Sequence, residues 1–459
     1  MKKQKDFLRF SAEAPAEFLD RSVLATQQLT NGLQTGKVMQ KTEDYWHMLG
    51  PGLTTGASDD DPSGIATYSQ TGAQFGFQFL WLAAWTFPLS AIVQEMCARI
   101  GLVTGRGLAG NIRVHFSRRI LYFCAVLLFA ANAINIGADL GAMAKAVQLL
   151  NPKLDFGILV TGFAIVSLFL QIYTPYVRYA RYLKWLALVL LAYVFSAILA
   201  HLHWSDVMTH AFVPNLHVGK QGLILLCAVL GTTISPYLFF WQTSQEVEEQ
   251  ILQGKTTLAE RRTATAPADI KSMRIDVWSG MFLSEVVMFF IIAACGGILY
   301  THGITNITSA AQAAEALRPF AGNATYFLFA IGIIGTGLLA IPVLAGSSSY
   351  ALTESFRWRE GLYRNIRQAY AFYGIIITSV LIGLAMNFLG IDPIKGLIYA
   401  ALVNGLVAPV VLCLIVVMSS NKKIMGRWVN KRSTVVWGWL ITAMMGLAGV
   451  AAIYALITS

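Results

Sequence analysis

Three consecutive carboxylates, Asp59, Asp60 and Asp61, stand directly before Pro62 in the first long apolar segment of the chain. Carboxylates at membrane depth are costly and mark ion or substrate pathways. Proline lacks the backbone N–H that a helix needs, so a helix broken at Pro62 leaves carbonyl groups that require another partner. A cation is the simplest group that satisfies both the carboxylates and the freed carbonyls, and the pattern therefore indicates a cation site.

A second proline interrupts a later apolar segment, within the sequence Gly-Thr-Thr-Ile-Ser-Pro-Tyr at 231–237. Proline-broken helices at corresponding positions of two halves of a chain are the sequence sign of the binding site of an inverted-repeat transporter. We expect Thr232 to offer a backbone carbonyl to the ion, and Ser235 to offer a hydroxyl or a contact to a bound water. The alternatives are a hydroxyl that bonds back to its own helix and a proline kink that serves packing only.

Composition places these residues in a membrane. The 459 residues are 56% hydrophobic and 13% charged, whereas about a quarter of a soluble domain is charged. We therefore expect a polytopic integral membrane protein that lies in a lipid bilayer. Residues 1–44 are polar, lack the apolar core of a secretory signal and are interpreted as a cytoplasmic tail. The net charge of +10 belongs to the loops between the spans, and we expect no nucleic-acid partner.

Eleven spans follow from the requirement of about 20 apolar residues per membrane helix. Basic residues crowd the tail and every second connection, for example Arg113, Arg118 and Arg119 after the second span. The positive-inside rule then places the N-terminus in the cytoplasm and, because the number of spans is odd, the C-terminus outside the cell membrane. The predicted spans are 48–72, 77–103, 120–149, 155–174, 182–201, 222–247, 275–300, 323–352, 368–389, 394–418 and 435–457.

The two proline breaks fall in the first and sixth spans. Five spans therefore make one repeat, and an odd number of spans inverts the second repeat in the membrane. We predict an all-α integral membrane protein with an inverted 5+5 repeat and broken helices 1 and 6. Its predicted parts are the tail at 1–44, the first repeat at 45–201, the second repeat at 202–418 and an additional transmembrane helix at 419–459.

The residues around the first break resemble those of the NRAMP (natural resistance-associated macrophage protein) family of divalent metal transporters. Asp-Pro-Ser-Gly at 61–64 and Gly-Ala-Gln-Phe-Gly at 72–76 are similar to the Asp-Pro-Gly-Asn and the following Gly-Ala-Gln-Phe-Gly of that family. The order of spans fits from about residue 48 to residue 418. The resemblance implies an amino-acid/polyamine/organocation transporter-like fold and uptake of a divalent metal by alternating access, with the ion held at the two breaks.

The departures from the family pattern concern the metal ligands. The family's Met-Pro-His of the sixth helix is Ser-Pro-Tyr at 235–237, its asparagine of the first helix corresponds to Gly64, and a second histidine corresponds to Gln242. Thioether and imidazole favour softer metals, whereas carboxylate, carbonyl, hydroxyl and water suit Mg²⁺, Ca²⁺ or Mn²⁺. The chain is thus most similar to the NRAMP-related magnesium transporter branch. We expect Mg²⁺ as cargo, with Mn²⁺ second, and no cofactor.

We expect the three aspartates of the acidic run to have different roles. Asp61 matches the family's aspartate and is expected to contact the ion directly or through water, beside Ser63 and Gly64. Asp59 and Asp60 are expected to raise the local cation concentration or to hold outer-shell waters. Equally, one of them caps the following half-helix, where a carboxylate favours the positive end of the helix dipole.

Other polar residues of the spans are candidates for an ion or proton path. Asp139 matches a family acidic position linked to proton movement, but the nearby family glutamate is Ala142 here, and no histidine lies at mid-span. This pattern argues against proton coupling and favours uptake driven by the membrane potential. Tyr237 and Gln242 are further candidates for the path.

Several glutamates have an open interpretation. Glu285 and Glu95 belong to the path, or they are neutral, or they pair with Lys145 or a backbone group. The glutamates that follow the sixth span form an acidic exit or, more simply, a solvated charge run; they are Glu246, Glu248 and Glu249.

Two other functions compete with metal transport. The same fold serves amine and amino-acid transporters, although three adjacent aspartates repel a carboxylate substrate. A membrane sensor that lost transport is the other alternative, although residues 1–44 do not resemble a signalling domain. The chain carries no nucleophile elbow or phosphate-binding loop that suggests an enzyme, and its pattern is compatible with a monomer.

Overall fold

The computed structural model of the protein describes residues 45–46, 48–174, 176–199, 202–214, 219–307, 309–389 and 393–457. Within these ranges the regular secondary structure is helical, without a β-strand. Gly50–Ser459 forms one compact unit. The cytoplasmic tail predicted at 1–44 lies outside the described residues.

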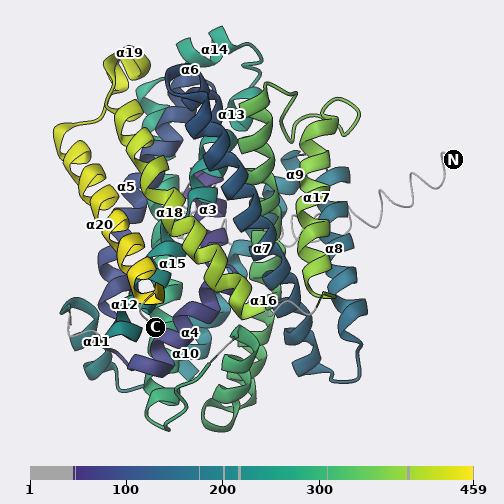
Figure 1. The fold of residues 1–459 in the computed structure, drawn as a ribbon, viewed down its shortest axis with the longest axis vertical. Helices are drawn as coiled ribbons and strands as arrows, with labels where there is room; N and C mark the ends of the chain where they lie inside the picture. The colour runs from purple at the N-terminus through teal and green to yellow at the C-terminus, as the bar shows by residue number, and fades with distance from the viewer. Residues whose placement is uncertain are drawn as a thin grey trace, which may run out of the picture. The chain divides into compact units, whose positions relative to one another are not determined.

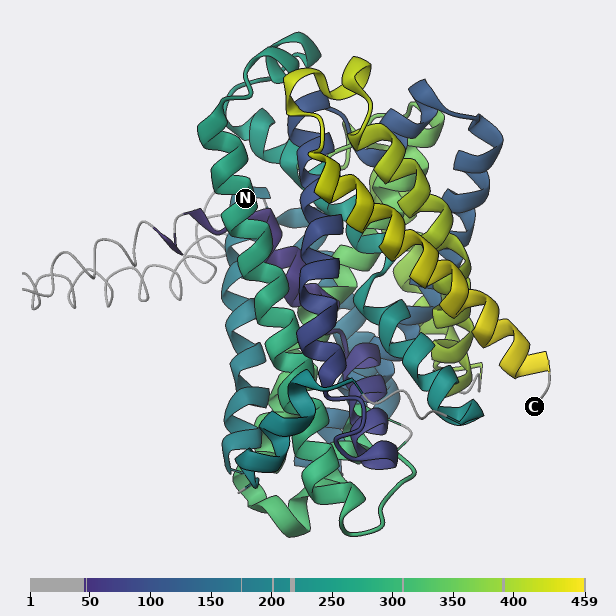
Figure 2. The same ribbon diagram turned by 90° about the vertical axis from the view of Figure 1, so that its left-hand side faces the viewer.

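The helices are α3 (Pro51–Asp59), α4 (Pro62–Phe75), α5 (Trp81–Thr104), α6 (Leu108–His115), α7 (Arg118–Leu150), α8 (Phe156–Tyr173), α9 (Tyr176–Leu186), η1 (Ala187–Leu190), α10 (Leu191–Leu199), α11 (Trp204–Phe212), α12 (Lys220–Thr233), α13 (Pro236–Leu252), α14 (Leu258–Thr263), α15 (Pro267–Cys295), the π-helical turn η2 (Gly296–Tyr300), α16 (Ala310–Phe356), α17 (Tyr370–Met386), α18 (Pro393–Ser419), α19 (Lys422–Met425), η3 (Gly426–Trp428) and α20 (Arg432–Ile457). The short α6, α14 and α19 lie at one end of the long helices, and α11 lies toward the other (Figure 1). The C-terminal α20 runs beside α18 and α12 (Figure 2).

Seven helices of the described residues are long and apolar enough to cross a membrane, or eight if the bent pair Val407–Ser419 and Lys422–Trp428 is one span. They confirm a helical protein with several membrane-spanning segments. Three predicted spans, 48–72, 77–103 and 368–389, coincide with helices that are shorter or less apolar, so the count of eleven stays a prediction. The seven are Arg118–Leu150, Phe156–Tyr173, Val177–Leu199, Lys220–Leu252, Pro267–Tyr300, Gly322–Phe356 and Arg432–Ala451.

Both predicted helix breaks are present. Helix α3 ends at Asp59 and α4 begins at Pro62, while α12 ends at Thr233 and α13 begins at Pro236. Proline suits the first position of a helix because the N–H that it lacks has no partner there, and its fixed φ is already helical. Each proline therefore ends one helix and starts the next.

Helix α3 packs with almost no space against α15. A Cβ on Gly56 would lie 2.1 Å from the carbonyl oxygen of Gly280, and one on Gly280 would lie 2.0 Å from that of Gly52. The Asp276 carboxylate of α15 also holds the start of α3: its Oδ1 accepts from the N–H groups of Gly50 (2.7 Å) and Leu53 (3.0 Å), and its Oδ2 from that of Gly52 (2.7 Å). These contacts fix α3 before the break.

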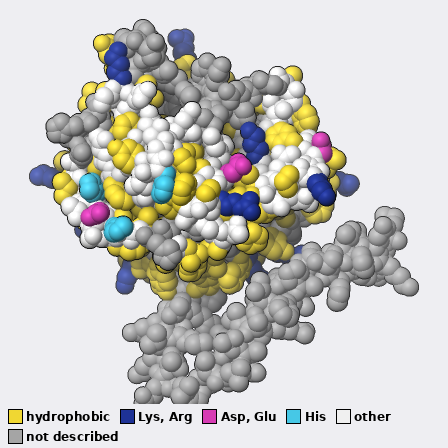
Figure 3. Space-filling view, turned by 90° about the horizontal axis from the view of Figure 1, so that it is seen from below, with side chains coloured by type: hydrophobic (Ala, Val, Ile, Leu, Met, Phe, Trp, Pro, Cys, Tyr) yellow, Lys and Arg dark blue, Asp and Glu magenta, His cyan; other side chains and the backbone are white. Residues whose placement is uncertain are grey.

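The end of the protein away from α6, α14 and α19 is shown in Figure 3. Histidine and hydrophobic side chains share this surface with scattered Lys, Arg, Asp and Glu side chains. The loop after η2 contributes Asn306 and Ile307 to the cavity described next.

Candidate metal site

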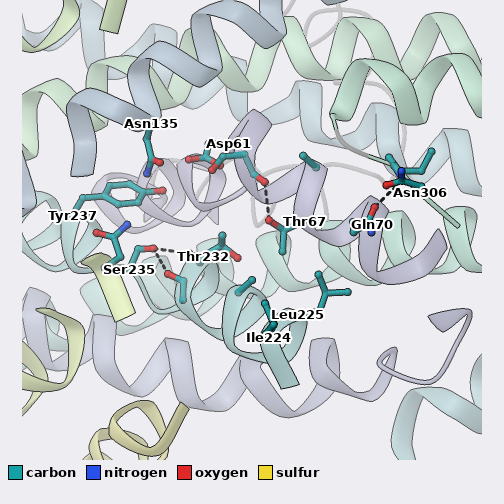
Figure 4. Close-up of a pocket in the computed structure, with 16 residues that line it drawn as sticks. Asp61, Thr67, Gln70, Asn135, Ile224, Leu225, Thr232, Ser235, Tyr237 and Asn306 are labelled. Atoms are coloured by element: carbon teal, nitrogen blue, oxygen red, sulfur yellow. Dashed lines mark hydrogen bonds between the residues drawn. The ribbon is translucent and has the colours of Figure 1, made fainter. Parts of the chain in front are cut away.

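A cavity of about 310 Å³ lies between the two helix breaks (Figure 4). It begins at Asp61 and Tyr237 and extends along α4 and α12 to Asn306, in the loop before α16. Five of the residues predicted for the site or path line it together. Its lining consists of Asp61, Ser63, Ala66, Thr67, Gln70, Asn135, Ile224, Leu225, Ala228, Gly231, Thr232, Ser235, Tyr237, Asn306, Ile307 and Asn404.

Asp61 is the carboxylate of this cavity and also the N-cap of α4. Its backbone is extended (φ −66°, ψ 165°), and its Oδ1 accepts from the Ser63 hydroxyl (2.6 Å) and the Gly64 N–H (2.6 Å). The expectation that Asp59 or Asp60 caps the half-helix is wrong, because the cap falls to the residue directly before Pro62. Gly64 enters the site through its backbone N–H, since it does not line the cavity.

Thr232 and Ser235 both line the cavity, but their hydroxyl groups turn back to helix α12. The Ser235 hydroxyl donates to the carbonyl oxygens of Gly231 (2.7 Å) and Thr232 (2.8 Å), and the Thr232 hydroxyl donates to Val229. This is the alternative that the sequence left open for these side chains. A carbonyl oxygen has two lone pairs, so the Thr232 carbonyl still has one for an ion.

Two tyrosines connect the broken helices to each other. The Tyr237 hydroxyl of α13 donates to the Ser58 carbonyl near the end of α3 (2.9 Å). The Tyr68 hydroxyl of α4 lies 3.4 Å from the Thr233 hydroxyl at the end of α12. Each half-helix is therefore joined to a half of the other broken helix, which fixes the relative position of Asp61 and Thr232.

Asp59, Asp60 and Glu285 lie outside this cavity. All three are buried; Asp59 accepts from the Ser284 hydroxyl (3.0 Å), and Glu285 accepts from two hydroxyl groups of α5, those of Thr86 (2.8 Å) and Ser90 (3.1 Å). One oxygen of Asp59 and both oxygens of Asp60 have no hydrogen-bond donor among the described residues. The acidic run is thus divided, with Asp61 on the cavity and its two neighbours beside Ser284 and Glu285 of α15.

Asp139 and Gln242 are also buried beyond the lining. Both carboxylate oxygens of Asp139 lack a donor in the described part of the chain, and its charge interacts with that of Asp61. Gln242 donates to Glu246 (2.9 Å). Glu246 and Glu248 are buried as well, so their interpretation as a solvated charge run is wrong.

Glu95 belongs to an ion-pair cluster away from the cavity. Its Oε1 pairs with Arg99 on the next turn of α5 and with Arg274 of α15, while its Oε2 accepts from the Trp278 N–H (2.8 Å). The expected pairing of Glu95 with Lys145 is wrong, because its partners are Arg99 and Arg274. These contacts join α5 to α15 and leave no role for Glu95 in lining the cavity.

Four amide side chains of the lining were not predicted: Gln70, Asn135, Asn306 and Asn404. Asn135 stands four residues before Asp139 on α7, so both share one helix face, and this spacing could have revealed it. Asn306 and Asn404 carry no comparable signal, because a single amide in a loop or an apolar helix is common.

The lining offers oxygen and nitrogen groups, with one carboxylate and without sulfur or imidazole. Oxygen groups suit hard divalent cations. Mg²⁺ prefers six octahedral ligands and keeps several waters, and six waters occupy about 180 Å³ at about 30 Å³ each. The cavity is therefore large enough for a hydrated ion. Among the described residues, no group of three or more His, Cys, Asp or Glu side chains is arranged to hold a bare metal.

The chain matches a known protein family and is similar in sequence to two divalent metal cation transporters. The family model described as "Natural resistance-associated macrophage protein-like" (Nramp) matches residues 52–455. The chain is 27% identical over 402 residues to the divalent metal cation transporter MntH of Klebsiella pneumoniae (strain 342), covering 87% of this chain and 91% of that protein. It is 24% identical over 428 residues to MntH of Caldanaerobacter subterraneus subsp. tengcongensis, covering 92% and 95%.

A solved structure shows the same fold. The crystal structure of a manganese transporter from Eremococcus coleocola superposes with a TM-score of 0.69 at 19% sequence identity, covering 92% of this chain and 89% of that chain.

Proposed function

The chain belongs to the Nramp (natural resistance-associated macrophage protein-like) family, and on this premise we propose that it carries Mg²⁺ into the cell, with Mn²⁺ as its second substrate. Relatives of the chain are divalent metal cation transporters. Transport of a divalent metal cation is therefore the general function, and the preference for Mg²⁺ is the specific part of the proposal.

One observation carries this preference: the cavity between the breaks combines a single carboxylate with neutral oxygen and nitrogen groups. Asp61 supplies the charge, the Thr232 carbonyl supplies a further oxygen, and amides such as Asn135 bind the waters of a hydrated ion. Without sulfur or imidazole in the lining, the site offers nothing that favours a softer metal. The volume leaves Mg²⁺ the waters that it gives up reluctantly.

The membrane potential is the proposed driving force. A divalent cation gains about 4.6 kcal/mol on moving inward through 100 mV, from about 2.3 kcal/mol per charge. The lining contains no histidine, and Asp139 lies outside it. We therefore propose facilitated uptake by alternating access rather than proton-coupled uptake.

The arrangement in the membrane completes the proposal. We infer a multi-pass protein of the cell membrane with eleven spans and two inverted five-helix repeats at 45–201 and 202–418, followed by one additional helix at 419–459. The N-terminus is cytoplasmic and the C-terminus lies outside. The loop that contains Asn306 then lies outside, so the cavity faces the outer side.

Uptake by liposomes tests the proposal. Purified protein is reconstituted around a Mg²⁺-sensitive dye, an inside-negative potential is imposed, and Mn²⁺ is titrated as competitor. Saturable Mg²⁺ entry is expected, and Asp61→Ala is expected to abolish it. Asp155→Ala is the matched control, because Asp155 also caps a helix, α8, but does not line the cavity.

The possible results separate the parts of the proposal. Entry of Mn²⁺ without Mg²⁺ contradicts the selectivity and keeps the general function. Entry of neither metal contradicts both and returns the amine transporter and the sensor to consideration. Equal loss in Asp61→Ala and Asp155→Ala shows that a helix cap, rather than the cavity carboxylate, limits transport.

A further inference from the structure

A second cavity, of about 390 Å³, lies at the end of the protein that carries α6 and α14. This is the predicted cytoplasmic end. Its walls come from the turn after α5, from α6, α13 and α14, and from the segment that begins at the end of α16. Four arginines and three glutamates line it: Arg106, Arg113, Arg261, Arg357, Glu248, Glu354 and Glu360.

Two of the glutamates are satisfied by neutral donors of the protein. Glu354 accepts from the Gly110 N–H (2.7 Å) and the Ser244 hydroxyl (3.0 Å). Glu248 accepts from the Tyr350 hydroxyl (2.6 Å) and from the N–H groups of Leu362 (2.8 Å) and Tyr363 (3.1 Å). Among the described residues, no ion pair joins the three glutamates to the four arginines. The carboxylates therefore hold the walls together, and they leave the guanidinium groups without a direct ion pair to them.

The arginine N–H groups have neutral acceptors or lack an acceptor among the described residues. Arg261 donates to the carbonyl oxygens of Gly105 (3.1 Å) and Thr256 (3.0 Å), which carry no net charge. In Arg113, Nε and one Nη are buried and have no acceptor in the described part of the chain, and its charge interacts with that of Arg357. A buried donor without an acceptor is costly, so an acceptor from outside the protein is the simplest remedy.

Glu360 is the remaining charge of the cavity. One of its oxygens has no donor among the described residues. Burial, together with the charges of Glu354 and Glu248, raises the pKa of Glu360 above its ordinary value. A protonated Glu360 removes a negative charge from the cavity and gains an O–H that can donate to an anion.

We propose that this cavity binds a phosphate group through Arg113 and Arg357. A planar guanidinium fork matches the oxygens of a phosphate, and Arg113 and Arg357 both line the cavity. The phosphate belongs either to a small soluble phosphate compound of the cytoplasm or to the headgroup of an anionic phospholipid of the inner leaflet. Either ligand connects α6 with the segment after α16. The site is separate from the cavity at Asp61, and its occupation does not depend on which metal is transported.

Binding to the purified full chain tests the proposal in two arms. In nanodiscs of phosphatidylcholine, inorganic phosphate is titrated and the midpoint of thermal unfolding is recorded. In a second arm, nanodiscs contain phosphatidylglycerol or phosphatidylcholine alone, and retained lipids are counted by native mass spectrometry. Stabilisation by phosphate identifies a soluble ligand, and retention of phosphatidylglycerol over phosphatidylcholine identifies a lipid headgroup.

Charge-matched variants decide whether the binding occurs in this cavity. The pair Arg113→Gln with Arg357→Gln is expected to weaken binding about tenfold or more, because both charge-assisted contacts are lost. The pair Arg113→Lys with Arg357→Lys keeps the charge and is expected to retain part of the affinity. Arg367→Gln removes an exposed arginine that does not line the cavity and is expected to have no effect. The proposal is overturned if neither anion binds the wild type, or if the glutamine pair binds as tightly as the wild type.

Discussion

The carboxylate of Asp276 is expected to decide how firmly helix α3 is held before the break. It accepts three backbone N–H groups at the start of that helix, from Gly50, Gly52 and Leu53, at 2.7 to 3.0 Å. These groups have no partner within the helix, because the first N–H groups of any helix lack one. Asp276 belongs to helix α15, so its replacement removes a cap that α15 supplies to the start of α3.

The substitution Asp276→Asn has a magnitude that follows from these contacts. The amide keeps one oxygen for Gly50 and Leu53, but its NH₂ then faces the Gly52 N–H, so a donor meets a donor. Hydrogen bonds to a charged group contribute about 1.5–3 kcal/mol each, so the loss of one bond and of the charge is expected to cost α3 about 3 kcal/mol. A cost of this size makes local opening about 100-fold more frequent.

Hydrogen exchange read by mass spectrometry measures this opening directly. The amides of 52–58 are expected to exchange about 100-fold faster in Asp276→Asn than in the wild type. Asp269→Asn is the matched control: Asp269 lies at the start of the same helix and accepts from the Ala266 N–H, far along the chain from α3. Exchange within about twofold of the wild type in Asp276→Asn would refute the reasoning and show that the close contact with Gly280 alone holds α3.

Three further predictions concern the site and its support. Asp61→Asn keeps an oxygen that can cap α4, so the unfolding free energy is expected to change by less than about 0.5 kcal/mol, while Mg²⁺ uptake by liposomes is lost with the charge; uptake at the wild-type rate would contradict a ligand role. Gly280→Ala places a Cβ 2.0 Å from the Gly52 carbonyl oxygen. The overpacking is expected to lower the free energy of unfolding by about 1–3 kcal/mol and with it the midpoint of thermal unfolding. An unchanged midpoint would show that α3 and α15 separate easily. Ser235→Ala removes a hydroxyl that bonds back to Gly231 and Thr232, so Mg²⁺ affinity is expected to stay within about twofold; a large loss would show that the hydroxyl reaches the ion.

The positions of the helix breaks could be predicted from the sequence because each of these prolines follows polar residues, three aspartates before Pro62 and the Thr-Thr-Ile-Ser run before Pro236. A proline alone is not sufficient, since Pro88 lies inside α5 and Pro409 inside α18. The division of the acidic run could not be predicted in the same way. Asp59 is still helical and turns toward Ser284, whereas Asp61 has extended backbone and turns into the cavity. Two residues along a chain that leaves a helix are enough to reverse the direction of a side chain.

Partners that are distant in the sequence explain the remaining differences. The pairing of Glu95 with Arg99 follows from the spacing of four residues on one helix, but its second partner, Arg274, lies 179 residues away. Glu248 follows an apolar span and looks solvated, yet the loop with Leu362 and Tyr363 folds over it and supplies two N–H donors. A hydrophobicity pattern contains no information on such covering loops.

The cap that Asp61 provides has a consequence for loading. Its Oδ1 already accepts from the Ser63 hydroxyl and the Gly64 N–H, so the lone pairs of that oxygen are in use. An ion that binds Oδ1 directly displaces at least one of these donors, and the first turn of α4 then frays. An ion that binds Oδ2, directly or through its waters, leaves the turn intact. The order of this turn therefore reports which oxygen of Asp61 the ion uses, and the Gly64 amide is the group in which a direct bond to Oδ1 becomes visible.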